Sequence, residues 1–315
     1  MYLKILLSTA SYLYLSSAVC FSQDSSVNIS NKVVTLKEVV IRSNLNVPRF
    51  IEQVEKDTTF YKAFKSLRIL GYTSLNDVRM QDKKNNVQAF LQSRTRQQVK
   101  NGCRSMEVLE ERTGGDIYDA SKNWNYYTGE LYAGLLLVKD TVCGETNIVK
   151  DAELSIKNKS GMEKHKEQLK MLFFNPGKKI PGIPFIGDKI AIFDEDMARY
   201  YDFIIDMEEY TGQTCYVFTI KAREDLTKSE QDKIVIDEMK TWFNSNTMEI
   251  AGRNYSLSYN AGVYDFDVRM EVQMTKAHGL LVPHVLRYTG NWHAIFKKRE
   301  RGIFTATLFD FTTGN

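Results

Sequence analysis

Residues 263–274, VYDFDVRMEVQM, decide the fold of this chain. Apolar side chains occupy every second position of the stretch, namely Tyr264, Phe266, Val268, Met270, Val272 and Met274. Charged or amide side chains occupy the positions between them, namely Asp265, Asp267, Arg269, Glu271 and Gln273. This alternation predicts a β-strand with one buried face and one solvated face. Because a slip of one residue would expose the whole apolar set, the register of the strand is tightly specified.

Further strands and short turns are expected on both sides of this stretch. Toward the C-terminus, the expected strands are residues 280–288, 292–299 and 303–311, with corners at Gly279, Gly290-Asn291 and Gly302. Toward the N-terminus, they are residues 201–210, 215–221, 234–236 and 248–259, with turns at Thr211-Gly212 and residues 260–262. Strand–turn–strand units at short spacing, with few crossover helices, predict an antiparallel sheet.

The first half of the chain also carries β signals, over residues 69–138. Asn101-Gly102 is the strongest short hairpin signal, and it separates the expected strands 87–99 and 104–112. An aromatic cluster then precedes the apolar run 135–138, and its members are Trp124, Tyr126, Tyr127 and Tyr132. We interpret this cluster as part of the core of the sheet.

Three helices are expected, at residues 48–67, 160–173 and 188–200. Asn46 is suited to cap the first helix, and a capping box at Ser160 and Glu163 opens the second. Asp57 and the two threonines after it compete for backbone hydrogen bonds, so they can kink or restart the first helix.

These elements together predict an α+β, β-rich fold in which a large antiparallel sheet curls into a half-barrel. A few helices then cover the concave face. This element order over residues 46–315 resembles the periplasmic lipoprotein carriers of the LolA/LolB type, and residues 254–267 are similar to exported proteins of Bacteroidetes. The resemblance implies a half-barrel fold and carries no functional residue over to this sequence.

The N-terminus has the features of a signal peptide in residues 1–22. Its apolar run is too short and too serine-rich for a membrane span, and we place cleavage after Ser22. A lipid anchor on Cys20 and an uncleaved anchor are the alternatives. Residues 23–45 are expected to form a flexible tail with a short edge strand, ahead of a single domain at residues 46–315. Export would place the protein in the periplasm or at the outer membrane.

Export also bears on the remaining cysteines, Cys103, Cys143 and Cys215. An oxidising compartment allows disulfides to persist. A bridge from Cys103 to Cys143 would close a loop worth about 4 kcal/mol in the chain-entropy model. The alternative is three unpaired thiols that are buried as small apolar residues.

Composition and motifs argue against several classes of function. A net charge of +3 without a basic face does not favour nucleic acid. The four histidines form no HExxH pair and the cysteines no CxxC, so neither a metal nor a cofactor is expected. Residues 182–189 have the glycine spacing of a phosphate loop without its Lys-Ser/Thr, so we interpret them as a lid.

One enzymatic alternative remains, a hydrolase with an unrecognised site. His284 and His293 flank the corner expected at Gly290, so they could approach each other on paired strands. Asp265 and Asp267 share one strand face and could in principle serve in acid–base chemistry. Alternation alone also explains the position of both carboxylates.

The apolar loop 178–187 gives the leading functional hypothesis, because such a loop must cover a cavity or meet a partner. We expect a non-enzymatic cell-envelope protein whose concave surface binds an apolar small molecule, a lipid or an acyl chain. The candidate ligand-binding residues are Ile180, Ile183, Phe185, Ile186, Tyr264, Phe266 and Trp292. The alternative is a structural or interaction protein that docks an envelope protein through its sheet edge or this loop. The basic run 297–301 could also make peripheral contact with the outer membrane.

Overall fold

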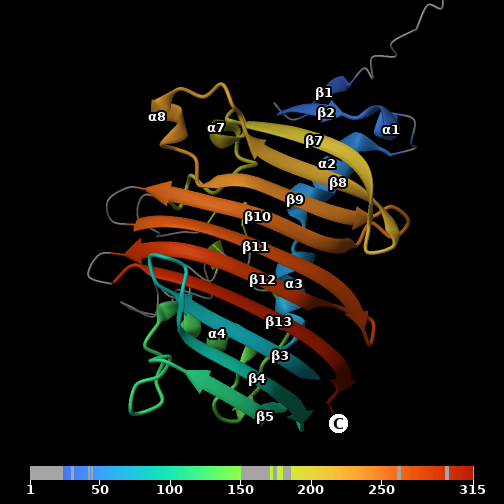
Figure 1. Ribbon diagram of the computed structural model, residues 1–315. Helices are drawn as coiled ribbons and strands as arrows, with labels where there is room; N and C mark the ends of the chain where they lie inside the picture. Colours follow the sequence, from blue (N-terminus) through green and yellow to red (C-terminus); the bar gives the residue numbers. More distant parts are fainter. Residues whose placement is uncertain are drawn as a thin grey trace, which may run out of the picture.

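The computed structural model describes residues 24–29, 32–41, 43, 45–149, 171–172, 176–179, 186–260, 264–294 and 298–314. Within these ranges, 13 strands form one sheet in the order β1-β2-β7-β8-β9-β10-β11-β12-β13-β3-β4-β5-β6. Figure 1 shows the curled sheet with α2, α3 and α4 on one side, which we call the inner face. The order ends at β1 and β6 without joining them, so the predicted unclosed, β-rich half-barrel is confirmed.

The elements have the following bounds. The strands are β1 Ser25–Ile29, β2 Lys32–Leu36, β3 Leu70–Gln81, β4 Val87–Lys100, β5 Cys103–Gly114, β6 Val142–Cys143, β7 Tyr201–Tyr210, β8 Gln213–Ala222, β9 Ile236–Asn244, β10 Ile250–Asn260, β11 Tyr264–Ala277, β12 Leu280–Ala294 and β13 Glu300–Thr313. The helices are α1 Glu38–Ile41, α2 Val47–Lys56, α3 Thr59–Ser66, α4 Tyr127–Leu136, α7 Glu195–Ala198 and α8 Lys228–Gln231. The pairings between these strands are antiparallel, except that β2 runs parallel to β7.

β11 shows the alternation that the sequence predicts. The apolar residues Phe266, Val268, Met270 and Val272 are buried on the inner face, and Asp267, Arg269 and Glu271 between them are exposed. A shift in the pairing with β12 after Gln273 then interrupts the pattern, so Met274 is only half-buried.

Two-residue turns set the register of the hairpins, as the Asn-Gly and Thr-Gly pairs predicted. Asn101 and Gly102 have φ values of 53° and 69° between β4 and β5, and Thr211 and Gly212 have values of 48° and 78° between β7 and β8. Positive φ at both turn residues matches the twist of the flanking strands, which is why such turns favour glycine at the second position.

The first expected helix is divided at the predicted place. α2 ends at Lys56, and the Asp57 carboxylate accepts hydrogen bonds from the Thr59 backbone N–H at 3.1 Å and its hydroxyl at 2.6 Å. These bonds begin α3 in place of a continued α2, because Asp57 has the extended ψ of 130°. The cover of the inner face is therefore two short helices with a break between them.

Residues 127–136 contradict the expected β structure, because they form α4. Their buried members Thr128, Leu131, Tyr132 and Leu136 follow helical spacing. The carboxylate of Glu300 on β13 accepts the first free N–H groups of the helix, those of Tyr127 and Thr128. A partner 173 residues away in sequence thus stabilises the start of α4, and the local apolar run gives no sign of this contact.

Two further segments differ from their predictions. The β-branched run at residues 33–42 favours an edge strand, but residues 38–41 form the helical turn α1. The Lys37 N–H makes the last bond to β7, and the chain then turns back. Residues 188–200 are mostly turns, with only α7 helical. Ile190 and Ile192 are both completely buried, and a continuous helix would point them in different directions.

The corner expected at Gly290-Asn291 is also wrong, since β12 runs straight through it. Gly290 pairs with Val268 on one side and with Gly302 on the other. A Cβ at residue 290 would lie 2.0 Å from the hydroxyl oxygen of Tyr288, so the glycine makes room for that ring within the strand. Glycine here serves close packing and not a turn.

Three other predicted segments can be placed briefly. Residues 25–36 contribute β1 and β2 to the sheet, and β2 pairs with β7 through Val34 and Phe203. The strand expected at 234–236 begins at Ile236 and continues to Asn244. The signal peptide 1–22 and the helix expected at 160–173 lie outside the described residues, apart from residues 171–172.

Candidate functional site

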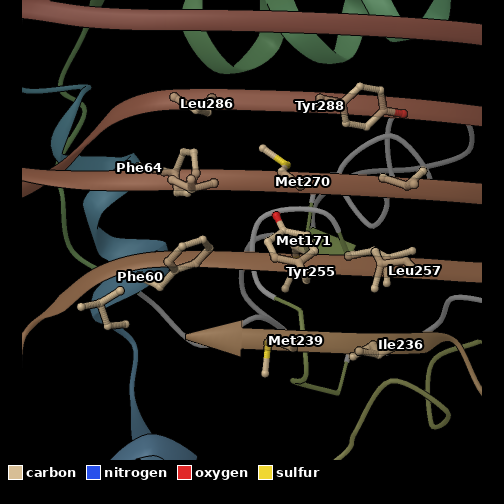
Figure 2. Packing of buried hydrophobic residues seen from close by; sticks show 14 of the residues in the cluster. Phe60, Phe64, Met171, Ile236, Met239, Tyr255, Leu257, Met270, Leu286 and Tyr288 are labelled. Atoms are coloured by element: carbon tan, nitrogen blue, oxygen red, sulfur yellow. The ribbon is translucent and has the colours of Figure 1, made fainter. Parts of the chain in front are cut away.

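The candidate site is the apolar inner face between the sheet and its helical cover. Figure 2 shows its buried side chains, which come from four neighbouring strands, from α3 and from the segment 171–172. The strand residues are Ile236, Met239, Tyr255, Leu257, Met270, Leu286 and Tyr288, and facing them are Phe60, Phe64 and Met171. Methionine side chains are flexible and polarisable, so they suit an apolar surface that must adapt to an occupant.

Aromatic contacts hold the helical cover on this face. Phe50 of α2 meets Phe243 edge-on, with ring centroids 5.2 Å apart, and Phe218 at 6.0 Å. Phe60 of α3 lies 6.5 Å from Tyr255 of β10. Each such pair adds about 0.5–1.5 kcal/mol beyond the buried area. A ligand can therefore reach the sheet only when these contacts separate.

Arg253 is a buried cation within this apolar layer. Its side chain is 6% exposed and lies on the inner face of β10. Its Nε donates to the Thr241 hydroxyl at 2.9 Å, and its guanidinium carbon lies 4.3 Å from the centroid of the Phe60 ring. No carboxylate of the described residues lies within ion-pair distance of it. Burial lowers the pKa of Arg253, although the nearby Asp57 charge opposes this.

Lys178 adds a second cation at the break between α2 and α3. Its ammonium donates to the backbone carbonyl of Glu55, close to the end of α2. Burial lowers the pKa of Lys178, and the charge of Arg253 contributes in the same direction while Asp57 opposes both. Two cations thus lie near the break in the cover, where the charge of Asp57 acts on both of them.

α4 covers the other half of the inner face, where the layer is more polar. Trp292 of β12 donates to the Thr128 hydroxyl at 3.1 Å, and that hydroxyl donates to Glu300 at 2.9 Å. Burial raises the pKa of Glu300, and its hydrogen bonds to α4 oppose the rise. Beneath the helix, the hydroxyl of Tyr132 donates to the side-chain oxygen of Asn76. These polar contacts fix α4 in place, and they suit an apolar ligand less than the face under α2 and α3.

The predicted ligand-binding residues are only partly assembled here. Phe266 and Trp292 are register partners on β11 and β12, and Phe266 is 5% exposed. Ile186 is completely buried in the same core. Ile180, Ile183 and Phe185 lie outside the described residues, and of Tyr264 only the backbone at the start of β11 is described. The sequence did not predict that Arg253 and Lys178 belong to the site. The one available signal was that Arg253 occupies a position of β10 that alternation assigns to the buried face.

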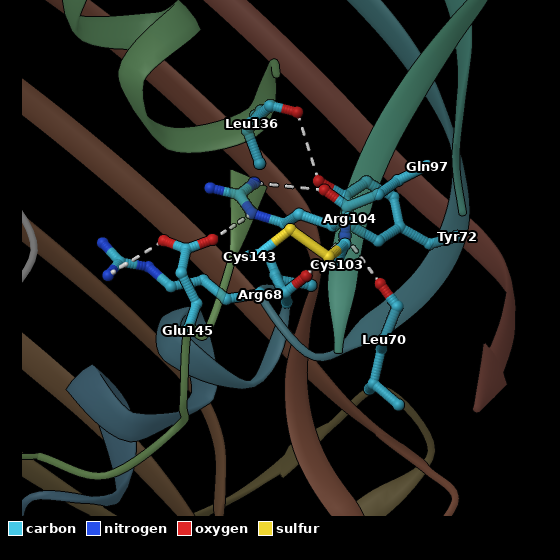
Figure 3. Close-up of polar contacts among 10 residues, drawn as sticks. Arg68, Leu70, Tyr72, Gln97, Cys103, Arg104, Leu136, Cys143 and Glu145 are labelled. Carbon is cyan, nitrogen blue, oxygen red and sulfur yellow. Dashed lines mark hydrogen bonds and ion pairs between the residues drawn. A yellow bond between two sulfur atoms is a disulfide. The ribbon is translucent and has the colours of Figure 1, made fainter. Parts of the chain in front are cut away.

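A disulfide joins the last two strands, β5 and β6, at one edge of the sheet. Cys103 at the start of β5 is bonded to Cys143 of β6, and Cys215 is a buried free thiol. Figure 3 shows that Arg104, next to this bond, pairs with Glu145, which also pairs with Arg68 at 3.5 Å. The disulfide and its ion pairs attach residues 142–145 to the end of α3, so this edge is structural.

The outer face of the sheet carries two polar grooves. One, of about 470 Å³, crosses β9, β10 and β11 between Asp237, Ser258 and Asp267. The other, of about 530 Å³, crosses β13, β3, β4 and β5 and includes Asp77 and Arg94. Charged and hydroxyl side chains dominate both linings, so neither groove suits an acyl chain.

The residues of the hydrolase alternative are not brought together. His284 and His293 lie on the same strand, β12, and at about 3.3 Å per residue they are about 30 Å apart. The expectation that they meet on paired strands is therefore wrong. His293 does pair with Asp265 in register, but the Asp265 carboxylate is bound to Arg299. Among the described residues, no cluster of histidine, cysteine and carboxylate side chains could hold a metal ion.

Comparisons with known proteins give structural likeness only. No family model and no curated protein matches the sequence. Among solved structures, the chain is similar to a DUF1329 family protein from Desulfovibrio piger, with 13% identity over 81% of this chain and 94% of the other, at a TM-score of 0.25. It is also similar to a domain from Vibrio parahaemolyticus described as an outer membrane lipoprotein-sorting protein, with 7% identity over 82% of this chain and 92% of the other, at a TM-score of 0.28.

Within the described ranges, every helix is too short or too polar to cross a bilayer.

Proposed function

We propose that this protein is a non-enzymatic binding protein of the cell envelope that holds a lipid or acyl chain against the inner face. The observation that supports this most directly is the continuous apolar lining under α2 and α3, with buried Met239 and Met270 at its centre. Two short helices joined at the Asp57 break form its cover, and we expect this cover to separate from the sheet when a ligand enters.

The charge of Arg253 fits an amphiphilic ligand. A guanidinium inside an apolar layer is costly unless a partner compensates it. A ligand with an apolar chain and a carboxylate or phosphate head would place the chain along the inner face and the head beside Arg253 and Lys178. The head would then supply the charge-assisted hydrogen bonds that a guanidinium forms best.

Two neighbouring residues of β11 provide the variants that test the proposal. Met270 is buried on the inner face, and Arg269 is exposed on the outer face. Met270→Trp overpacks the centre of the lining, at a cost of about 1–3 kcal/mol in stability. We expect it to reduce uptake of a fluorescent fatty acid by at least tenfold. Arg269→Trp adds the same ring to the other face and should leave uptake within twofold of wild type.

The assay uses protein purified from its native host. Lipid extracted from the wild-type protein is identified by mass spectrometry, and the delipidated protein is then titrated with the fluorescent fatty acid. Circular dichroism verifies that each variant is folded. Protein that carries no lipid and takes up no fatty acid would contradict the proposal and would favour the envelope-protein-docking alternative.

A further inference from the structure

A groove at one end of the sheet gathers cations that the apolar site does not use. It has a volume of about 560 Å³ and lies between the turn after α7 and the segment around α8. Figure 1 shows both helices beside the start of β7. The cations that line the groove are Arg199, Arg223 and Lys233.

Tyr200 organises the two cations that matter most. Its ring is buried, with 3% of the residue exposed. Arg199 donates to its hydroxyl oxygen at 2.8 Å and Lys233 donates to the same oxygen at 3.0 Å. The guanidinium carbon of Arg199 lies 4.8 Å from the ring centroid and the ammonium of Lys233 lies 5.3 Å from it. Two positive charges are therefore held within about 6 Å of each other, where they repel.

The nearby carboxylates make their closest contacts with other groups. Asp225 forms a two-bond ion pair with Arg223, at 2.9 and 2.6 Å. Glu230 accepts from the backbone N–H of Thr227 at 2.9 Å and from its hydroxyl at 2.6 Å. Within the described part of the chain, neither Arg199 nor Lys233 has a carboxylate at ion-pair distance. The two cations therefore lie beside the hydroxyls of Thr227 and Ser229, and the charge of Glu230 acts on both of them without a direct ion pair.

We propose that this groove binds a phosphate group through Arg199 and Lys233. A phosphate dianion carries two charges on one small centre, so it matches two cations within about 6 Å of each other better than a single carboxylate does. Arginine can offer it two parallel N–H groups, while lysine contributes a point charge. The proposal does not depend on the lipid site of the inner face, since neither Arg199 nor Lys233 belongs to its apolar core.

Tyr200 reports on occupancy of the site. Lys233 is the main cause that lowers the pKa of Tyr200, and Arg199 contributes in the same direction. A bound phosphate would compensate these charges, so the pKa of Tyr200 should rise toward its ordinary value. Absorbance at the phenolate band during alkaline titration measures this change, and Tyr200→Phe removes the signal.

In the binding experiment, the full chain is titrated with inorganic phosphate and the heat of binding is measured by calorimetry. We expect saturable binding, with an association constant that falls at least tenfold in Arg199→Gln and in Lys233→Gln. Lys228→Gln is the matched control, because Lys228 is on α8 but does not line the groove, and it should remain within twofold of wild type. Circular dichroism checks that the variants fold, which is expected because the side chains of Arg199 and Lys233 are solvent-exposed.

Vesicles separate the two sources of a phosphate group. Binding to vesicles that contain phosphatidic acid, but not to vesicles of phosphatidylcholine alone, would assign the site to a lipid headgroup. Binding of inorganic phosphate without vesicle binding would assign it to a soluble phosphate compound. Absence of both, or binding that Arg199→Gln and Lys233→Gln leave unchanged, would overturn the proposal.

Discussion

Arg253 is a buried charge among apolar neighbours. Its guanidinium is buried against Phe60 and has only the Thr241 hydroxyl as a hydrogen-bond acceptor among the described side chains. Apolar residues of similar volume often stabilise a protein when they replace a buried charge. If Arg253 serves the ligand and not the fold, its removal should not harm the fold.

We predict that Arg253→Met leaves the free energy of unfolding unchanged or raises it by up to about 4 kcal/mol. The same variant should lose retention of anionic lipid while Arg253→Lys, which preserves the charge, retains part of it. Urea unfolding and the lipid extract measure the two effects. A loss of more than about 2 kcal/mol in Arg253→Met would indicate that the residue is structural.

Asp237 provides a residue-scale prediction that depends on pH. Burial raises the pKa of Asp237; the Ser258 hydroxyl opposes the rise and the charge of Asp267 adds to it. Because the folded-state pKa lies above the unfolded value, the proton is bound more tightly in the folded state. The associated stability is complete below the unfolded pKa and is lost as pH rises through the folded pKa.

Asp237→Asn should therefore be more stable than wild type at pH 7, and the difference should shrink as pH falls toward about 4. The asparagine oxygen can still accept the Ser258 hydroxyl, which donates to Asp237 at 2.7 Å. Thermal unfolding at several pH values gives the difference directly. Asp232→Asn, at an exposed position, is the control; an equal pH-dependent gain in that variant would refute the assignment to Asp237.

At the scale of elements, the disulfide attaches the short edge strand β6 to β5. It joins residues that are 40 positions apart in sequence. A loop of that length gives about 4 kcal/mol of stabilisation in the chain-entropy model. The ion pairs of Arg104 and Glu145 beside it are partly exposed and contribute much less.

The double variant Cys103→Ala with Cys143→Ala should lose about 4 kcal/mol of unfolding free energy. Reductant should lower wild-type stability to the level of this variant and leave the variant itself unchanged. Cys215→Ala is the control, because its buried thiol takes no part in the bond, and it should remain sensitive to reductant. Equal urea midpoints for wild type with and without reductant would contradict the prediction.

Elements defined by local signals were predictable, and those defined by distant partners were not. The alternation of Phe266, Val268 and Met270 and the Asn101-Gly102 turn determine β11 and the β4–β5 hairpin within a few residues of sequence. α4 depends on Glu300, and the break in β12 that Gly290 suggested is absent because the glycine makes room for Tyr288. Neither contact is visible in a local pattern.

The candidate site shows the same division at the scale of the whole molecule. Strand periodicity predicted that Phe266 and Trp292 belong to the inner face or its border, because alternate residues of a strand point to the same face. It could not predict that Arg253 would lie under the break after Asp57, because that depends on how α2 and α3 cross the sheet. The cation pair at Tyr200 likewise unites side chains from two separate turns.

The position of β13 has a consequence for how the chain reaches this fold. β13 is the last strand of the described chain, yet it lies inside the sheet between β12 and β3. Until it arrives, the hairpins built on β3 and the meander that ends at β12 are two separate sheets, each with an unsatisfied edge. Pairing of Thr312 with Gly71 closes a very long loop, so assembly should be slow and a shortened C-terminus should yield two half-sheets prone to self-association.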